Sequence, residues 1–153
     1  MREVKTIGAD DARRGITAVR ATAERRDQAV VVAIADAYGE LLALLRMDGA
    51  GPGDIAPAIA KAYTAARLGQ STRAIESAAR NPKTGFDLAV FADPRITGLI
   101  GGVPMEYEGE TVGAVGVSGA APDTEEALAE AGITAMREPY APAQAVGEDP
   151  EIP

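Results

Sequence analysis

Cysteine and histidine, which carry much of the chemistry of enzymes, are both absent from this sequence of 153 residues. Without cysteine there is no thiolate nucleophile, disulfide framework or cysteine-based zinc site, and nothing argues for an oxidising compartment. Without histidine there is no Ser-His-Asp triad and no imidazole metal ligand. Any chemistry must therefore use carboxylates, Lys, Arg, Tyr, Ser, Thr or backbone amides, and we expect no metal site.

Basic charge and long apolar runs are also scarce. The net charge is −8, which argues against a nucleic-acid partner, because phosphate backbones are bound by clustered Lys and Arg. The longest apolar run, AVVVAIA at 29–35, is too short to cross a bilayer, and the N-terminal stretch has no apolar targeting segment. We therefore expect a cytoplasmic protein without a membrane partner, and its length fits one domain.

The first half of the sequence alternates helical and extended patterns. Apolar residues spaced three or four apart predict a helix from Ala9 to about Arg26. Two apolar runs joined by a segment that ends in Gly39 predict a β-hairpin, with this glycine in the left-handed conformation. Asp54 is the predicted N-cap of a helix that runs to about Leu68.

The second half repeats this order. Ser71 or Thr72 is expected to cap a short helix that ends at Ala79, followed by one helical turn near 86–92. A second hairpin is predicted over 103–117, and a last helix from Pro122 to about Met136. The predicted fold is α/β (α+β), one antiparallel sheet flanked by helices, with a domain at 1–136 and an acidic, proline-containing tail at 137–153.

Four stretches combine a sharp turn with polar groups. They are RMDGAGPGD (46–54), KAYTA (61–65), GGVP (101–104) and GVSGA (116–120). In this order the set resembles the GlcG/HbpS family, often described as haem-binding or haem-degrading, which also supplies the C-terminal domain of PduO-type corrinoid adenosyltransferases. The resemblance covers about residues 5–135. It implies a profilin-like single-domain fold, assembly into homo-oligomers and a place in small-molecule catabolism.

The missing histidine bears on the cofactor that this resemblance implies. Haem iron is usually held by His, Cys, Met or Tyr, so haem is possible here only without a histidine ligand. The four tyrosines and four methionines remain as donors, and their spacing selects none of them.

Arg46 and Asp48 in the first stretch are either ligand contacts or a turn-capping ion pair, while Met47 between them is expected in the core. In the second stretch Lys61 and Thr64 lie three apart on one helix face. That face is either solvated, or it presents an ammonium and a hydroxyl to a ligand carboxylate. Lys61 is also the candidate catalytic base.

The other two stretches offer backbone amides and a hydroxyl. Gly101 and Gly102 either supply a loop conformation with positive φ or, with Val103, form a small anion-binding concavity. Ser118 is expected to orient a ligand or cap the last helix, since no histidine is present to activate it as a nucleophile. The nearby Glu125 is expected only to favour the start of that helix.

These residues lead to one prediction and one alternative. The prediction is a homo-oligomeric small-molecule-binding protein, with a ligand that is haem-like or a small organic acid. Its pocket is formed by the GGVP loop, the end of the GVSGA strand and the Lys61 to Thr64 helix. The alternative is a catabolic enzyme that performs acid/base chemistry on a small carboxylate, with Lys61 as base or electrostatic stabiliser and the amides of Gly101 and Gly102 steadying an oxyanion.

Overall fold

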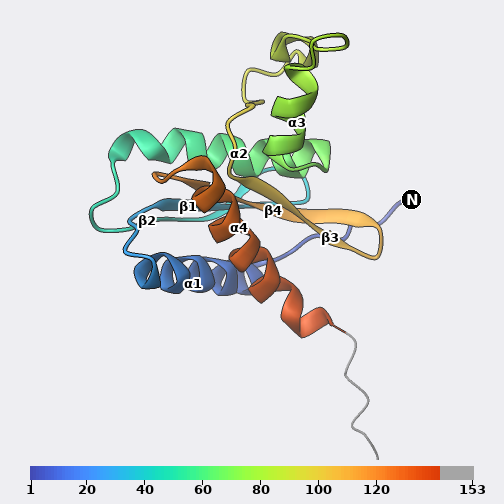
Figure 1. Ribbon diagram of the computed structural model, residues 1–153. Coiled ribbons are helices and arrows are strands. Elements are labelled where there is room, and N and C mark those ends of the chain that lie inside the picture. Colours follow the sequence, from blue (N-terminus) through green and yellow to red (C-terminus); the bar gives the residue numbers. More distant parts are fainter. Residues whose placement is uncertain (142–153) are drawn as a thin grey trace, which may run out of the picture.

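A computed structural model describes residues 1–141 and is shown in Figure 1. Its regular elements are α1 (Ala9–Arg25), β1 (Val31–Asp36), β2 (Leu41–Arg46), α2 (Ile55–Leu68), α3 (Thr72–Ala79), β3 (Gly102–Tyr107), β4 (Glu110–Ser118) and α4 (Pro122–Arg137). Short 3-10 helices occupy Pro52–Asp54, Leu88–Phe91 and Glu138–Tyr140. The predicted order of helix, hairpin, two helices, hairpin and helix is therefore confirmed.

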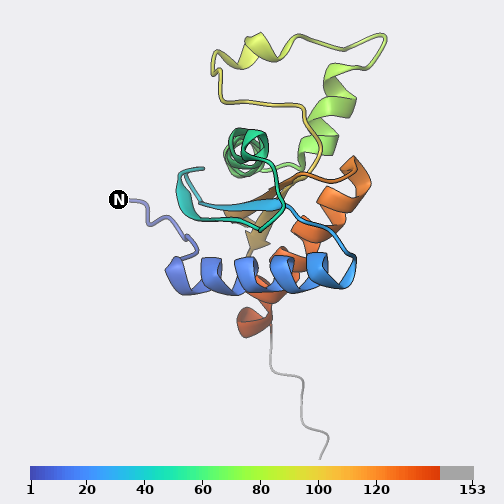
Figure 2. The same ribbon diagram turned by 90° about the vertical axis from the view of Figure 1, so that its left-hand side faces the viewer.

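The four strands form one antiparallel sheet in the order β2-β1-β4-β3. Helix α2 covers one face, and α1 with α4 covers the other (Figures 1 and 2). The central strands β1 and β4 are buried on both sides, so their side chains feed two apolar clusters in alternation. This confirms the single-domain α+β fold with helices on both faces of the sheet.

Glycines in the sheet allow α2 to approach very closely. A Cβ atom added at Gly116 would lie 2.2 Å from the Ala58 carbonyl oxygen, and one at Gly102 would lie 2.4 Å from the Lys61 carbonyl oxygen. The space that larger side chains would need at these positions of β3 and β4 is therefore occupied by the backbone of α2.

The two hairpin turns take the conformations that their residues predict. Gly39 has φ +88°, and the second turn has left-handed residues at Glu108 (φ +49°) and Gly109 (φ +78°). Two successive positive φ values are typical of the type I′ turn, whose twist matches that of the strands it joins.

The segment between α2 and β3 stands away from the sheet. Helix α3 and the chain up to about residue 100 rise beyond α2 in both views (Figures 1 and 2). Ser71 caps α3 as predicted, accepting a 3.2 Å hydrogen bond from the Ala74 amide. The predicted helical turn near 86–92 is the 3-10 helix Leu88–Phe91.

The first residues of the predicted tail contact the domain. Residues Glu138–Tyr140 continue from α4 as a 3-10 helix, and the Tyr140 hydroxyl donates a 2.7 Å hydrogen bond to Asp11 at the start of α1. Residues 138–140 of the predicted tail are thus in contact with the domain, while 142–153 lie outside the described residues and the division of the chain at 137 stays a prediction.

Within residues 1–141, no helix has the length and apolar character needed to cross a membrane.

Candidate functional site

Lys61 lies inside the protein. Only 3% of its surface is exposed, and its Nζ donates to Glu125 Oε2 at 2.7 Å and to the Val117 carbonyl oxygen at 2.8 Å. The interpretation of its helix face as solvated is therefore wrong, because α2 turns this face onto β4. Both hydrogen bonds hold the ammonium within the protein, and a catalytic or ligand-binding role of Lys61 stays a prediction.

Glu125 has a larger role than the sequence indicates. Its Oε1 accepts hydrogen bonds from the amides of Gly119 (2.8 Å) and Ala120 (3.3 Å), and its Oε2 accepts from Lys61. The carboxylate thus ties the turn between β4 and α4 to the middle of α2. The expectation that Glu125 only favours the start of the last helix is corrected by these contacts.

The GGVP loop is used for packing. Gly101 has φ +126°, which confirms the loop conformation, whereas the Gly102 amide donates to Thr72 Oγ1 at 2.9 Å and is not free for an anion. Val103 belongs to the apolar core. Thr64 is fully buried and accepts a 3.0 Å hydrogen bond from the Thr97 amide. Ligand contacts by these residues stay a prediction, and in the structure each packs within the protein.

Ser118 connects β4 to the loop before α2. Its hydroxyl donates to Asp54 Oδ1 at 3.2 Å. The alternative in which Ser118 caps the last helix is wrong, since Ala121 holds that position without a side-chain hydrogen bond. Asp54 occupies the N-cap position of α2, but its side chain makes no capping hydrogen bond there. The contacts of Lys61 and Ser118, with the 3.0 Å hydrogen bond from the Val117 amide to the Gly101 carbonyl oxygen, bring the predicted stretches together at one end of the sheet.

Arg46 reaches the same end of the sheet from β2. In the strand register Val31 of β1 pairs with Arg46 on one side and with Ser118 on the other. Residues paired across strands point to the same face, so Arg46 and Ser118 flank Val31, about 10 Å apart across two strand spacings. Arg46 is exposed and makes no ion pair among residues 1–141.

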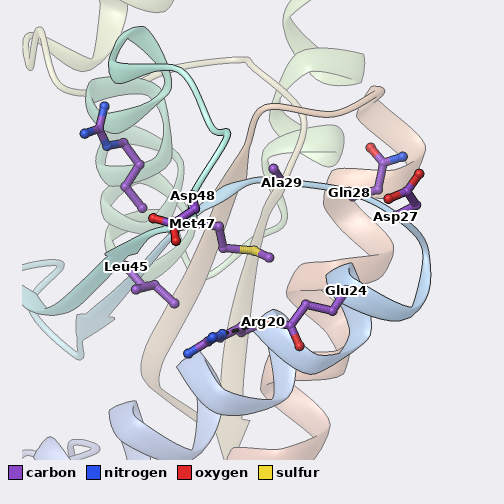
Figure 3. Close-up of a pocket in the computed structure, with 9 residues that line it drawn as sticks. Arg20, Glu24, Asp27, Gln28, Ala29, Leu45, Met47 and Asp48 are labelled. Atoms are coloured by element: carbon purple, nitrogen blue, oxygen red, sulfur yellow. Dashed lines mark hydrogen bonds and ion pairs between the residues drawn. The ribbon is translucent and has the colours of Figure 1, made fainter.

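A cavity of about 450 Å³ opens beside Arg46 and Asp48 (Figure 3). Leu45 and Met47 contribute its apolar surface, and Figure 3 shows both pointing toward Arg20 of α1. The other lining residues are Glu24, Asp27, Gln28 and Ala29. Two arginines, three acidic residues and one methionine are among the lining residues, but Arg46 pairs with Val31 and so directs its side chain to the α2 face, away from Leu45 and Met47. Met47, expected in the core, is partly buried at this cavity.

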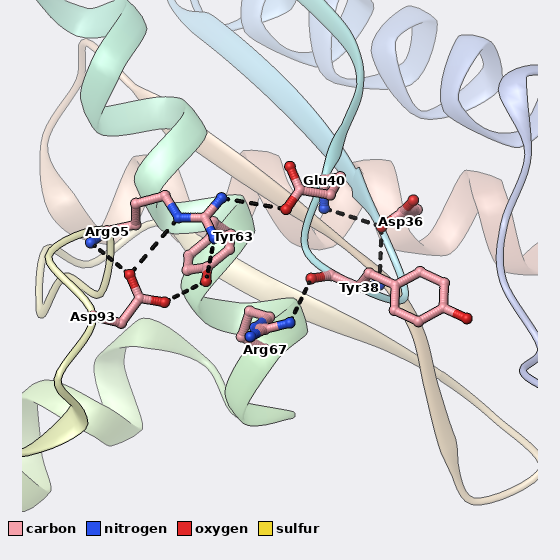
Figure 4. Close-up of polar contacts among 7 residues, drawn as sticks. All are labelled: Asp36, Tyr38, Glu40, Tyr63, Arg67, Asp93 and Arg95. Atoms are coloured by element: carbon pink, nitrogen blue, oxygen red, sulfur yellow. Dashed lines mark hydrogen bonds and ion pairs between the residues drawn. The ribbon is translucent and has the colours of Figure 1, made fainter.

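A second polar cluster surrounds Tyr63 on α2 (Figure 4). The Tyr63 hydroxyl donates to Asp93 and accepts a 2.8 Å hydrogen bond from Arg95 Nη2. The Arg95 guanidinium lies 3.8 Å from the centroid of the Tyr63 ring, and its Nη1 donates to Glu40 at 3.2 Å. A cavity of about 250 Å³ adjoins this cluster.

The ionisation of this cluster follows from its contacts. Burial, together with the hydrogen bond to Asp93, raises the pKa of the Tyr63 phenol above its ordinary value. The same hydrogen bond and the Arg95 amide lower the pKa of the Asp93 carboxyl. At neutral pH the phenol is therefore protonated and the carboxylate charged.

No pattern in the sequence predicts this cluster. Asp93-Pro94-Arg95 has the composition of an ordinary surface turn, and no spacing indicates that it folds back onto α2. The available signal was Tyr63, a large aromatic residue in an alanine-rich helix, whose hydroxyl needs a partner when buried.

Few of the described side chains are placed to hold a cofactor. No group of three or more Asp and Glu residues could hold a metal ion within residues 1–141. Tyr63 and Tyr140 use their hydroxyls on Asp93 and Asp11, while Met105 and Met136 are core residues. Met47 is the sulfur donor that lines the larger cavity.

Comparison with known proteins agrees with this architecture. The profile of the family described as haem degrading protein HbpS-like matches residues 7–134. The chain belongs to this family. Protein GlcG of Escherichia coli K12 is 42% identical over 105 residues, which span 67% of this chain and 74% of GlcG.

Solved structures of HbpS-like proteins have the same fold. Klebsiella pneumoniae protein ORFY has a TM-score of 0.82 at 30% identity, covering 89% of this chain and 94% of ORFY. A double mutant of Streptomyces reticuli HbpS has a TM-score of 0.77 at 30% identity, covering 88% of this chain and 89% of HbpS. The resemblance identified from the four stretches is thereby confirmed.

Proposed function

We propose that this HbpS-like protein is a cytoplasmic homo-oligomer that binds a small molecule carrying a carboxylate. Haem and small organic acids both meet this description. The proposed site lies at the end of the sheet where the exposed Arg46 stands beside the buried Val31 and Ser118 on the α2 face, and the cavity of Figure 3 opens on the α1 face of the same strand end. Asp48 completes its rim.

The exposed Arg46 guanidinium is the observation that carries this proposal. Arg46 has no ion pair among residues 1–141, and its pairing with Val31 places its side chain on the α2 face of the sheet, where its planar fork of donors is exposed for a carboxylate. The neighbouring cavity on the α1 face has about 450 Å³, within the range of about 300–1,000 Å³ that ligand sites occupy. Lys61, by contrast, is neutralised by Glu125, so it lends the site no free charge.

The family description supports a haem-like ligand as one possibility. Of the residues at this cavity, Met47 has the thioether that can hold haem iron, and Arg20 on the same wall can pair with a propionate. When bound, haem would supply the redox chemistry of its iron. A small hydroxy acid is the other possibility, because its hydroxyl groups can donate to the carboxylates at the rim while its own carboxylate pairs with an arginine.

Exposed apolar side chains support the homo-oligomer. Val90 and Leu99 are 64% and 54% exposed, and both lie on the segment that stands away from the sheet. Large exposed apolar residues grouped on one projection are typical of protein contacts. A second copy of the chain is the partner that we propose for them.

Ligand titration of the Arg46→Gln variant tests the proposed site. Hemin binding is followed by the shift of its Soret band, and binding of lactate and succinate by calorimetry. Whichever probe binds the wild-type protein should bind the variant about tenfold or more weakly, because a charge-assisted hydrogen bond pair is lost.

Arg13→Gln is the matched control, since Arg13 is an exposed arginine near the other end of α1. It should bind the same probe as the wild type does. Equal affinities of the two variants, or no saturable binding of any of the three probes, would contradict the proposed function.

A further inference from the structure

The cavity beside Tyr63 lies at the opposite end of the sheet from Arg46. It is lined by Gly39, Glu40 and Leu41 at the turn of the first hairpin, by Ala56, Ile59, Ala60 and Tyr63 of α2, and by Arg95. In the strand register this hairpin turn follows the Ala35 and Leu41 pair, whereas Arg46 pairs with Val31 at the other end of β1. The cavity is therefore separate from the site proposed above.

The walls of the cavity beside Tyr63 are apolar, whereas its rim is charged. The walls are aliphatic or aromatic, and the only charged lining residues are Glu40 and Arg95. Figure 4 shows these two side chains directed toward each other, with the Arg95 guanidinium next to the Tyr63 ring. A molecule with an apolar body and one charged group matches this arrangement.

Contacts with Tyr63 and Asp93 hold the Arg95 guanidinium in place. Its Nη2 donates to the Tyr63 hydroxyl, its Nε lies 3.7 Å from Asp93 Oδ1, and its plane lies against the Tyr63 ring. The loop that carries it is fixed to α2 by the Thr97 amide, which donates to Thr64. These contacts orient the fork of donors before any ligand arrives.

The contact between Arg95 and Glu40, by contrast, is an exposed ion pair. Their side chains are 54% and 64% exposed, and a single 3.2 Å hydrogen bond joins them. Exposed ion pairs of this kind contribute little to stability, so another carboxylate can take the place of Glu40.

From this geometry we infer that the cavity binds a small monocarboxylate with an apolar body, whose carboxylate displaces Glu40 from Arg95. The body of the ligand lies against Leu41, Ile59 and Tyr63. A volume of about 250 Å³ equals that of roughly eight water molecules, so the ligand has about ten non-hydrogen atoms or fewer. Haem is far too large for this site.

Calorimetric titration with hexanoate and benzoate tests the inference. Both should bind the wild-type protein saturably, and hexanol, which lacks the carboxylate, should bind more weakly. Arg95→Gln should lower the affinity for hexanoate about 10- to 100-fold. Glu40→Gln should raise it about 2- to 5-fold, because it removes the competing carboxylate.

The opposite signs of these two variants distinguish binding from a structural effect. Circular dichroism and the urea midpoint establish that each variant is folded, and Arg13→Gln should bind as the wild type does. If Glu40→Gln weakens binding, or Arg95→Gln leaves it unchanged, the inference fails. Loss of hexanoate binding in Arg46→Gln but not in Arg95→Gln would overturn it while supporting the proposed function.

Discussion

Lys61 and Glu125 form a buried ion pair whose two members are each also hydrogen-bonded to the backbone. The pair is 3% and 6% exposed, and together its members bond to the Val117 carbonyl and to the amides of Gly119 and Ala120. Such a pair fixes which elements meet, here α2, β4 and the start of α4. Its role is therefore to hold the motif stretches together.

Removing one partner should be costly, because the other charge is left buried alone. We expect Lys61→Met to lower the free energy of unfolding by about 3 to 5 kcal/mol, measured by urea denaturation. Lys83→Met, which changes an exposed lysine in the loop after α3, should change it by less than about 0.5 kcal/mol. Equal effects of the two variants would show that the pair has no structural role.

Asp11 links the start of α1 to the end of the described chain. Burial by itself would raise the pKa of its carboxyl, but hydrogen bonds from the Gly8 amide and the Tyr140 hydroxyl, with the charge of Arg14, lower the pKa below the ordinary value of 3.8. A lowered pKa in the folded state contributes stability above pH 3.8, and this contribution is lost as the pH falls through the folded value.

Asp11→Asn should therefore cost about 1 to 2 kcal/mol of unfolding free energy at neutral pH. Urea denaturation at neutral pH and at about pH 3 should show that the difference in unfolding free energy between this variant and the wild type is smaller in acid. Asp10→Asn, an exposed neighbour on the same turn, is the control and should show little difference at either pH. A difference for Asp11→Asn that grows in acid would contradict this account.

At the scale of elements, the contact of α2 with the sheet depends on glycine. The Gly116 position has a backbone oxygen 2.2 Å and a backbone nitrogen 2.5 Å from where a Cβ would lie, and neither can move alone. Gly53, which precedes α2, has nothing within 4 Å of its added Cβ and no positive φ.

Gly116→Ala should consequently destabilise the protein by about 3 kcal/mol or more, since α2 must move off the sheet. Gly53→Ala should be neutral or slightly stabilising. Thermal unfolding followed by circular dichroism compares the two variants. If both have the wild-type midpoint, the close approach of α2 does not limit stability.

The elements were largely predictable because their signals are local. Periodicity marks α1, two apolar runs mark the first hairpin, and Gly39 marks its turn. The orientation of α2 was not predictable. Its alanines are small enough to pack against a neighbouring element on any face of the helix. The pattern of apolar residues therefore could not indicate that Lys61 faces the sheet and that Ile59 lines an outer cavity.

The residues of the candidate site were predictable only in part, because most of their contacts join distant parts of the chain. Lys61 and Glu125 are 64 residues apart, and Tyr63 and Asp93 are 30 apart. Pairing across such distances leaves no spacing signal in one sequence. The four stretches identified the family, and only the structure revealed the cluster at Arg95.

At the scale of the whole molecule, the segment between α2 and β3 that stands away from the sheet provides a test of assembly. Replacing both Val90 and Leu99 with serine should lower the subunit number by removing apolar surface from the proposed interface between copies. Light scattering coupled to size exclusion measures this number. Val4→Ser, which changes another exposed valine, is the control. An unchanged mass for the double variant would place the interface elsewhere on the molecule.

Native mass spectrometry of the purified protein tests the central claim most directly, because it reports subunit number and retained ligand together. For the wild-type protein we predict a homo-oligomer that carries a non-covalent small molecule, from the cell or after incubation with hemin, lactate or succinate. The adduct should be lost in Arg46→Gln and kept in Arg13→Gln. A monomer without adduct under all of these conditions would contradict the claim.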